Sequence, residues 1–322
     1  MDAYRRDREG AREAGDQQRL CGSWSGACHV EVVTRSSAAV SLGASGHLTE
    51  ESSVPLAALE PDPTPPRHSS VLNIAHRGAS CSAPENTLVA VHRAADLGAD
   101  MVEIDVRLSR DGVPMVIHDE SLARTTDARW VFPQRAPWHV ADFDHGELMR
   151  LDAGTWFSSA YAGEPMVTLD QVLDAARVRR VAVLVELKSP RLHVSFLSEV
   201  AAVIRRQLAK GDGLQAVVQS FDHVAMREFK AGLPSVPVGL LGMPSPCEFE
   251  ELSEWADHVN PHHLLVNRGY VDAVQQHAMR CHVWTVNRRR AMRRVLGWGV
   301  DGVISNRPLV LREELGDRLK VP

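Results

Sequence analysis

From residue 71 onward the chain alternates between short apolar runs of β-forming residues and longer segments with helical periodicity. The apolar runs typical of strands cover 71–75, 101–106, 181–187, 216–221, 236–241, 263–266, 281–286 and 301–304. The helical segments cover 85–97, 168–177, 194–210, 223–230, 247–256, 270–279 and 288–296. Strands that alternate with helices in this way predict a closed parallel (β/α)8 barrel, the TIM-barrel fold of the α/β class.

One further apolar run, 113–117, follows the strand at 101–106 too closely to be reached through a helix. The connection is Ser109-Arg-Asp-Gly112, and the Asp-Gly pair is typical of tight hairpin turns. We therefore expect 113–117 to form an extra strand that pairs antiparallel with its predecessor.

The segment 119–166 interrupts the alternation and is rich in aromatic residues. They are Trp130, Phe132, Trp138, Phe143, Trp156, Phe157 and Tyr161. Long irregular insertions in compact domains are usually lids or binding loops. Because this insertion begins directly after His118, we expect it to cover the mouth of the barrel. The alternative is a small satellite core that does not contact the substrate.

Residues 1–68 differ from the rest of the chain. They run from a charged start through Ser-, Ala- and Gly-rich sequence to Glu60-Pro-Asp-Pro-Thr-Pro-Pro-Arg67, which resembles an extended linker. We expect a disordered or loosely attached extension at 1–68, followed by a barrel domain at 69–322.

Composition narrows the possible partners and the compartment. A net charge of −5 gives no reason to expect nucleic acid, and no apolar run approaches the roughly 20 residues of a membrane-spanning helix. We therefore expect no stable membrane insertion. The start of the chain shows no apolar signal segment, and five scattered cysteines without metal-site spacing favour a reducing compartment. A cytoplasmic enzyme is the expectation, and its oligomeric state is left open.

Two acidic residues lie two positions apart in the second predicted strand. Glu103 and Asp105 therefore point to the same face of that strand, and His118 ends the strand that follows. Burying several charged side chains together is costly unless a cation or a charged substrate lies among them. This stretch predicts a functional site.

Other strands also end in polar residues. The first ends in His76 and Arg77, and the third carries Glu186 and Lys188, again two apart. Barrel enzymes place their catalytic residues at the carboxyl ends of the parallel strands. We therefore expect these four residues to lie near Glu103, Asp105 and His118.

This ordered set resembles the glycerophosphodiester phosphodiesterase family over about three quarters of the chain, residues 71 to roughly 310. The matching elements are His76-Arg-Gly78, Pro84-Glu-Asn-Thr87, Glu103-Ile-Asp105, His118-Asp119, Glu186-Leu-Lys188, Gln219-Ser-Phe221, Trp284-Thr-Val-Asn287 and Asp301-Gly302. The aromatic segment 119–166 lies where the family has its characteristic insertion.

The residue types indicate roles that agree with the resemblance. Glu103, Asp105 and Glu186 would form an oxygen-only shell for one hard divalent cation, Mg²⁺ or Ca²⁺. Arg77 and Lys188 would bind phosphate oxygens, since arginine can grip two of them.

His76 and His118 come from different parts of the expected site, which suits an acid and a base acting on the attacking and leaving oxygens. The resemblance implies that the same two histidines are catalytic.

Four further residues are candidates near the site. The resemblance favours Trp284 as a wall for the alcohol portion of the substrate, with ordinary barrel packing as the alternative. Gln219 either binds the substrate or orients a neighbour. Glu85 and Asn86 are expected to be structural, because Pro84-Glu-Asn-Thr87 reads chiefly as a helix start.

The expected activity is metal-dependent hydrolysis of a small glycerophosphodiester to glycerol 3-phosphate and an alcohol. Two alternatives stay open at this point. One is lysophospholipase D-type cleavage of lysolipids, for which the aromatic insertion would supply an apolar groove. The other is a barrel that binds a phosphate-bearing ligand without catalysis.

Overall fold

The computed structural model describes residues 71–211 and 213–318 of the chain. The extension predicted for residues 1–68 lies outside the described residues, and the domain boundary at 68 and 69 stays a prediction. None of the described helices is both long and apolar enough to cross a membrane.

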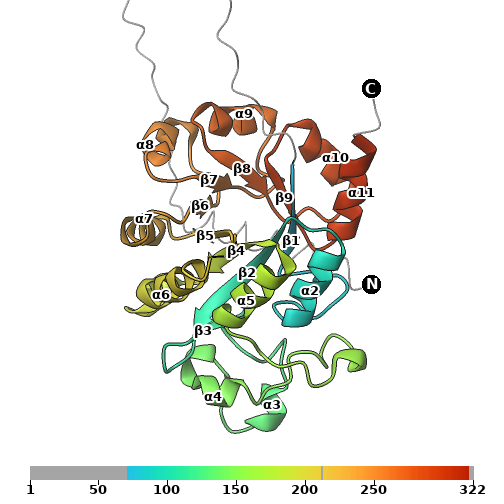
Figure 1. Cartoon of the computed structure of the whole chain (residues 1–322), viewed down its shortest axis with the longest axis vertical. Coiled ribbons are helices and arrows are strands. Elements are labelled where there is room, and N and C mark those ends of the chain that lie inside the picture. Colours follow the sequence, from blue (N-terminus) through green and yellow to red (C-terminus); the bar gives the residue numbers. More distant parts are fainter. Residues whose placement is uncertain (1–70, 212, 319–322) are drawn as a thin grey trace, which may run out of the picture. The chain divides into compact units, whose positions relative to one another are not determined.

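Eight parallel strands close into a barrel at the centre of the described chain (Figure 1). They are β1 (Leu72–His76), β2 (Met101–Leu108), β4 (Ala182–Leu187), β5 (Ala216–Ser220), β6 (Val238–Leu241), β7 (His258–Asn260), β8 (Arg280–Val283) and β9 (Gly302–Ser305). Pairing of β1 with both β2 and β9 closes the sheet on itself. The predicted barrel is confirmed.

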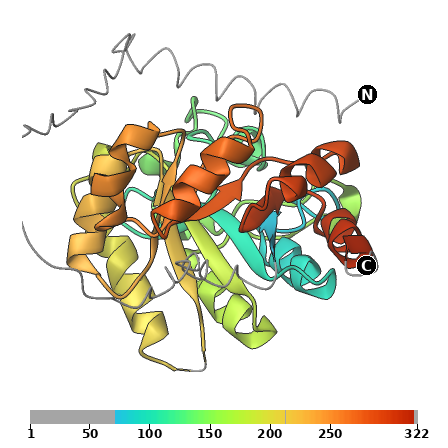
Figure 2. The same ribbon diagram turned by 90° about the horizontal axis from the view of Figure 1, so that it is seen from above.

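Helices surround the barrel and bury its outer face (Figures 1 and 2). They are α2 (Leu88–Asp96), α5 (Leu169–Arg179), α6 (Phe196–Leu208), α7 (His223–Gly232), α8 (Phe249–Ser253), α9 (Arg268–Gln276), α10 (Arg289–Gly297) and α11 (Pro308–Arg318). The last of these, α11, has no counterpart among the predicted helical segments. Alternate strand residues such as Val102, Ile104 and Val106 pack against the helices, so the residues between them face the barrel interior.

The sixth of the eight predicted barrel strands is misplaced. The run 263–266 is not a strand; the strand is His258–Asn260. Both ends of β7 are polar and buried, so the strand lacks the apolar run by which a buried strand is normally predicted. Leu264 and Leu265 instead lie in a turn before α9 with 60% and 39% of their surface exposed.

The extra hairpin strand is confirmed. β3 (Pro114–Val116) pairs antiparallel with the end of β2, in the register Val106 to Val116 and Leu108 to Pro114. The turn depends on Gly112, whose φ of 81° is a conformation that side chains disfavour.

The insertion after β3 contains short helices and has a small core of its own. Its elements are α3 (Ala128–Val131), η1 (Val140–Asp142), α4 (His145–Leu148) and η2 (Ser159–Tyr161). Phe143 and Leu148 are fully buried there together with Met115 of β3, and the rings of Phe132 and Phe143 lie 5.1 Å apart. The insertion therefore has the small core of its own that was considered as the alternative to a lid. A lid function stays a prediction.

Two histidines are buried together inside the barrel. His258 on β7 and His282 on β8 have ring centroids 4.6 Å apart. A Cβ at Gly302 of β9 would lie only 2.7 Å from the His282 ring, so glycine there makes room for it. Neither ring nitrogen of His282 has a hydrogen-bond partner among the described residues.

Burial, together with the charges of Arg280 and Lys230, lowers the pKa of His258 to about 3. Burial, followed by the neighbouring His258, lowers the pKa of His282 well below its ordinary value of 6.5, although Asp301 opposes this. The folded protein therefore keeps both rings neutral, while the unfolded chain accepts a proton on each as the pH falls.

We expect the free energy of unfolding to fall as the pH drops below about 6.5, by about 1.4 kcal/mol per pH unit for each of the two histidines. A His282→Leu variant should lose part of this slope, because leucine has no proton to bind in the unfolded state. Urea unfolding of both proteins between pH 7.5 and pH 5 measures the effect. Parallel stability curves would contradict the prediction.

Candidate active site

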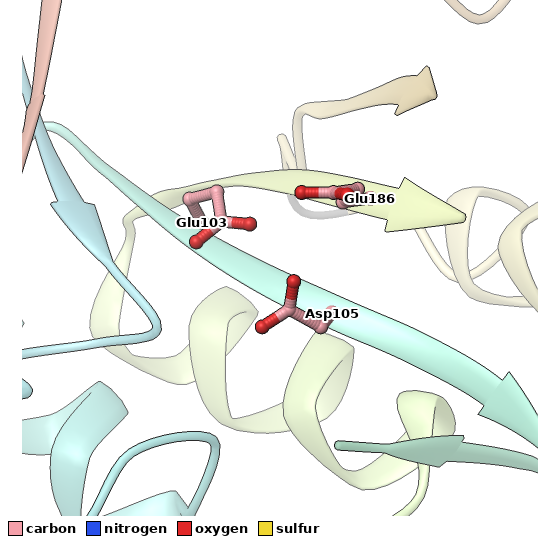
Figure 3. Close-up of side chains that lie close together, drawn as sticks. All are labelled: Glu103, Asp105 and Glu186. Atoms are coloured by element: carbon pink, nitrogen blue, oxygen red, sulfur yellow. The ribbon is translucent and has the colours of Figure 1, made fainter. Parts of the chain in front are cut away.

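Three buried carboxylates meet inside the barrel. Glu103 and Asp105 lie on β2 and Glu186 lies on β4, where Asp105 and Glu186 are paired in register. Each offers one oxygen within 4.8 Å of the others, and Figure 3 shows the three side chains lying close together. The two-residue spacing on β2 places both of its acids on the interior face, as the sequence predicts.

Two cations lie against these acids. Lys188, directly after β4, places its Nζ 3.1 Å from Asp105 Oδ1 and 2.5 Å from Glu186 Oε1. Arg77, directly after β1, places its Nε 3.3 Å from Asp105 Oδ2, and its backbone N–H donates to Glu103 Oε2 at 2.9 Å. When ionised, the three carboxylates carry one more charge than these two cations offset.

The electrostatic environment differs among the three acids. Burial, followed by the charges of the other two acids, raises the pKa of Glu103 well above its usual range. Burial also raises the pKa of Glu186, although Lys188 opposes it. Burial alone would raise the pKa of Asp105 too, but Lys188 and other neighbouring cations hold that pKa well below its usual range. Further positive charge at the cluster would stabilise the ionised form of all three.

The cluster has the ligands that a divalent cation requires. Glu103 Oε1 is buried and has no hydrogen-bond donor among the described residues, an arrangement that is costly for a polar atom. Oxygen-only ligands suit hard cations such as Mg²⁺ and Ca²⁺. Glu103, Asp105 and Glu186 are the one group of three potential ligands found in the described part of the chain, and they fit such a cation.

His76 ends β1 beside the cluster. Its Nε2 lies 3.9 Å from Glu103 Oε2, and its Nδ1 lies 2.6 Å from the Asn306 side-chain oxygen after β9. Asn306 is itself oriented by Asn287, whose side-chain oxygen accepts from its backbone N–H at 2.9 Å. Burial, followed by the charge of Arg77, lowers the pKa of His76 to about 4.

His118 follows β3 and has a different partner. Its Nδ1 lies 2.7 Å from Asp119 Oδ1. Burial and the charge of Arg77 would lower the pKa of His118, but Asp105 and the hydrogen bond with Asp119 outweigh them and raise it. Arg107 of β2 donates from Nε to the His118 carbonyl at 2.8 Å and fixes the backbone there.

The residues before α2 form hydrogen bonds with residues of the site, in addition to starting the helix. Thr87 alone caps α2, through a hydrogen bond from the Ala90 N–H. Asn86 donates to Asp105 Oδ2 at 2.8 Å and accepts from the Asp105 backbone N–H at 3.2 Å. Glu85 accepts from Arg77 at 3.0 Å. Glu85 and Asn86 therefore orient site residues, while the helix cap is a separate function of their neighbour.

Gln219 and Trp284 are held by one strand that the sequence did not predict. Asn260 of β7 donates from Nδ2 to Gln219 Oε1 at 2.7 Å, and its backbone carbonyl accepts from Trp284 Nε1 at 2.8 Å. Gln219 is paired in register with Glu186, next to the acidic cluster. The Trp284 ring packs edge-on against Phe221 at 5.7 Å.

Sequence reasoning assigned no role to four residues that hold these side chains in place: Asp119, Arg124, Asn260 and Asn306. Two of these roles have a signal in the sequence. Asp119 directly follows His118, and Asn306 directly follows the last strand. Arg124 in the insertion gives no signal of that kind.

We expect replacement of Asn86 to destabilise the protein by roughly 1–3 kcal/mol, because it leaves buried polar groups of Asp105 without partners. Asn86 has a φ of 60°, so Asn86→Ala adds backbone strain that Asn86→Gly avoids. Urea unfolding should therefore rank wild type above Asn86→Gly, and Asn86→Gly above Asn86→Ala. Equal stability of all three proteins would show that these hydrogen bonds do not stabilise the fold.

Comparison with known proteins supports the resemblance. Residues 76–310 match the glycerophosphoryl diester phosphodiesterase family. A glycerophosphodiester phosphodiesterase of Caldanaerobacter subterraneus is 33% identical over 74% of this chain and 96% of its own length. One from Bacillus subtilis is 30% identical over 74% of this chain and 84% of its own length.

A solved structure gives the same result for the fold. An Oleispira antarctica phosphodiesterase, solved in complex with the product sn-glycerol-3-phosphate, superposes with a TM-score of 0.69 and 28% identity. The match covers 76% of this chain and 96% of the other. The barrel, the buried acidic cluster and the family match agree, and the chain belongs to the glycerophosphoryl diester phosphodiesterase family.

Proposed function

We propose that this phosphodiesterase hydrolyses glycerophosphodiesters to glycerol 3-phosphate and an alcohol, with a divalent cation bound by the acidic cluster. The observation that carries the proposal is the arrangement of three buried carboxylates within 4.8 Å, with two cations against them. His76 ends β1 and His118 follows β3, and both of these strands pair with β2, which carries two of the acids. The product named for the Oleispira antarctica structure supports the choice of substrate class.

Glu103, Asp105 and Glu186 would hold the cation, and Mg²⁺ and Ca²⁺ are the ions that such ligands prefer. A bound cation would neutralise charge that develops on the phosphate during cleavage. Arg77 and Lys188 lie close enough to Asp105 to contact a phosphate placed there, and the arginine presents a planar pair of donors.

The partners of the two histidines indicate how they would share the proton transfers. His118 is paired with the carboxylate of Asp119, which stabilises a protonated ring and suits an acid that delivers a proton to the leaving alcohol. His76 is paired with the neutral side chain of Asn306, which suits a base that removes a proton from the attacking oxygen.

The alcohol side of the site is proposed to lie toward Trp284 and the insertion. The edge-on pair of Trp284 and Phe221 would supply an apolar wall, and Asn260 bonds to both Trp284 and Gln219. A compact head group and a lysolipid chain would both contact such a wall. Parallel assays with glycerophosphocholine and lysophosphatidylcholine distinguish the two substrate classes.

The compartment is a separate prediction. Cys81, Cys247 and Cys281 are free thiols in the described part of the chain, in keeping with the expected reducing environment. A cytoplasmic location stays a prediction, and no oligomeric state is predicted.

We expect excess EDTA to abolish release of glycerol 3-phosphate from glycerophosphocholine, and Mg²⁺ or Ca²⁺ to restore it. Asp105→Asn should weaken cation binding measured by isothermal titration calorimetry, because it removes one charge from the cluster. Glu314→Gln is the matched control, since Glu314 is a buried acid on α11 that pairs with Arg289 and Arg293 outside the cluster. Full turnover in excess EDTA would overturn the metal assignment.

We expect His76→Ala and His118→Ala each to lower kcat by about 10²- to 10⁴-fold, because each removes a proton-transfer group. His277→Ala is the control, since His277 directly follows α9 and its ring bonds to the Ala273 carbonyl of that helix. Steady-state rates and melting temperatures of the three variants separate catalysis from stability. Near-normal turnover by either site variant removes that histidine from the mechanism.

A further inference from the structure

Arg124 lies in the insertion, in the turn that follows β3 and precedes α3. Its guanidinium binds two carboxylates at once. Nε and Nη2 lie 2.5 and 3.1 Å from the two oxygens of Asp119, while Nη2 and Nη1 lie 2.7 and 3.1 Å from the two oxygens of Glu85. The rigid fork of arginine makes such a double contact possible, which a lysine ammonium would not reproduce.

Each of the two carboxylates in turn holds a residue of the proposed catalytic machinery. Asp119 is paired with His118 at 2.7 Å, and Glu85 accepts from Arg77 at 3.0 Å. The result is a chain of alternating charge, Arg77–Glu85–Arg124–Asp119–His118, in which Arg124 is the central member. It connects Arg77, which is proposed to bind the phosphate, to His118, which is proposed to donate the proton.

The charges of this chain support one another. Burial would raise the pKa values of both acids, but Arg77 and Arg124 lower the pKa of Glu85 to about 2. Hydrogen bonds from His118 and Arg124 likewise hold the pKa of Asp119 well below its usual range. Both acids are therefore ionised at neutral pH, and the guanidinium between them stabilises the charge of each.

In the described part of the protein, the polar contacts of Arg124 are those with the two acids, and it has one further contact with an aromatic ring. The guanidinium carbon lies 5.8 Å from the centre of the Trp156 ring, and among the described residues its ion pairs are those with Glu85 and Asp119. It forms none with the acidic cluster. We therefore expect its effect on the reaction to pass through the two carboxylates.

We infer that Arg124 is a positioning residue, which places His118 through Asp119 and Arg77 through Glu85 for the reaction. This inference rests on the proposed function, because it takes His118 as the acid for the leaving alcohol. It assigns the insertion a part in the catalytic geometry itself, in addition to any choice of head group.

The test compares two substrates that differ in their need for an acid. The choline oxygen of glycerophosphocholine leaves with a proton, whereas 4-nitrophenolate leaves a 4-nitrophenyl glycerophosphate without one. For Arg124→Gln we expect kcat on glycerophosphocholine to fall by about 10²-fold, and kcat on the nitrophenyl ester to fall by less than about 10-fold. KM should rise for both substrates, because Arg77 loses its support.

Arg135→Gln is the matched control. Arg135 also lies in the insertion, pairs with Glu147 at 2.6 Å and stacks on the Phe143 ring at 3.8 Å, away from His118. It should change stability without changing the ratio of the two kcat values. Arg124→Lys keeps the positive charge but loses the planar set of donors. It is the variant to use if Arg124→Gln does not fold. It should show the same selective loss in weaker form.

The outcomes are distinct. If wild type does not cleave glycerophosphocholine, the proposed function fails. If wild type cleaves it and the folded Arg124 variant lowers kcat on both substrates by the same factor, or leaves both unchanged, Arg124 has no positioning role for His118. A selective loss on the choline substrate that is absent from Arg135→Gln supports the inference.

Discussion

The burial of three carboxylates at one point inside the barrel is the interaction on which the rest of the site depends. Each acid alone would be costly to keep ionised away from water, and together they repel one another. Lys188 and Arg77 offset part of that charge, at 3.1 and 3.3 Å from Asp105. The negative charge that they leave uncompensated suits the cluster to the divalent cation proposed to bind there. The same negative charge holds Arg77 and Lys188 here, the two residues proposed to bind phosphate.

The barrel supplies the rigidity that this cluster needs. Parallel strands paired in register hold Asp105 opposite Glu186, so backbone hydrogen bonds set the spacing of the acids. Side chains from loops then orient them, as Asn86 does through two hydrogen bonds to Asp105. A site built on strands and adjusted by loops is more precise than one built on loops alone.

The insertion combines two structural functions. Phe143 and Leu148 pack with β3 into a small core, which anchors the segment to the barrel. From this anchored base Arg124 pairs with both Glu85 and Asp119. A segment that needed only to cover the mouth would not require such contacts. The core fixes where the arginine can reach, and this is how the insertion would contribute to the proposed catalysis.

The sequence by itself determined the barrel and its acidic cluster. Strand and helix periodicities are local, so the eight-strand alternation could be read along most of the chain, and a two-residue spacing is enough to put Glu103 and Asp105 on one face. The strand at 258–260 was missed because its buried polar residues interrupt the apolar pattern.

Only the tertiary structure decided which side chains hold the site together. Asn306 contacts His76 across 230 residues, and Arg124 contacts Glu85 across 39. No local periodicity reports such pairs, because they depend on barrel closure and on the path of the insertion. Closure brings β9 beside β1, and the packing of the insertion on β3 brings the guanidinium between two carboxylates. Those long-range contacts, more than the residue types, set the geometry on which the proposed chemistry depends.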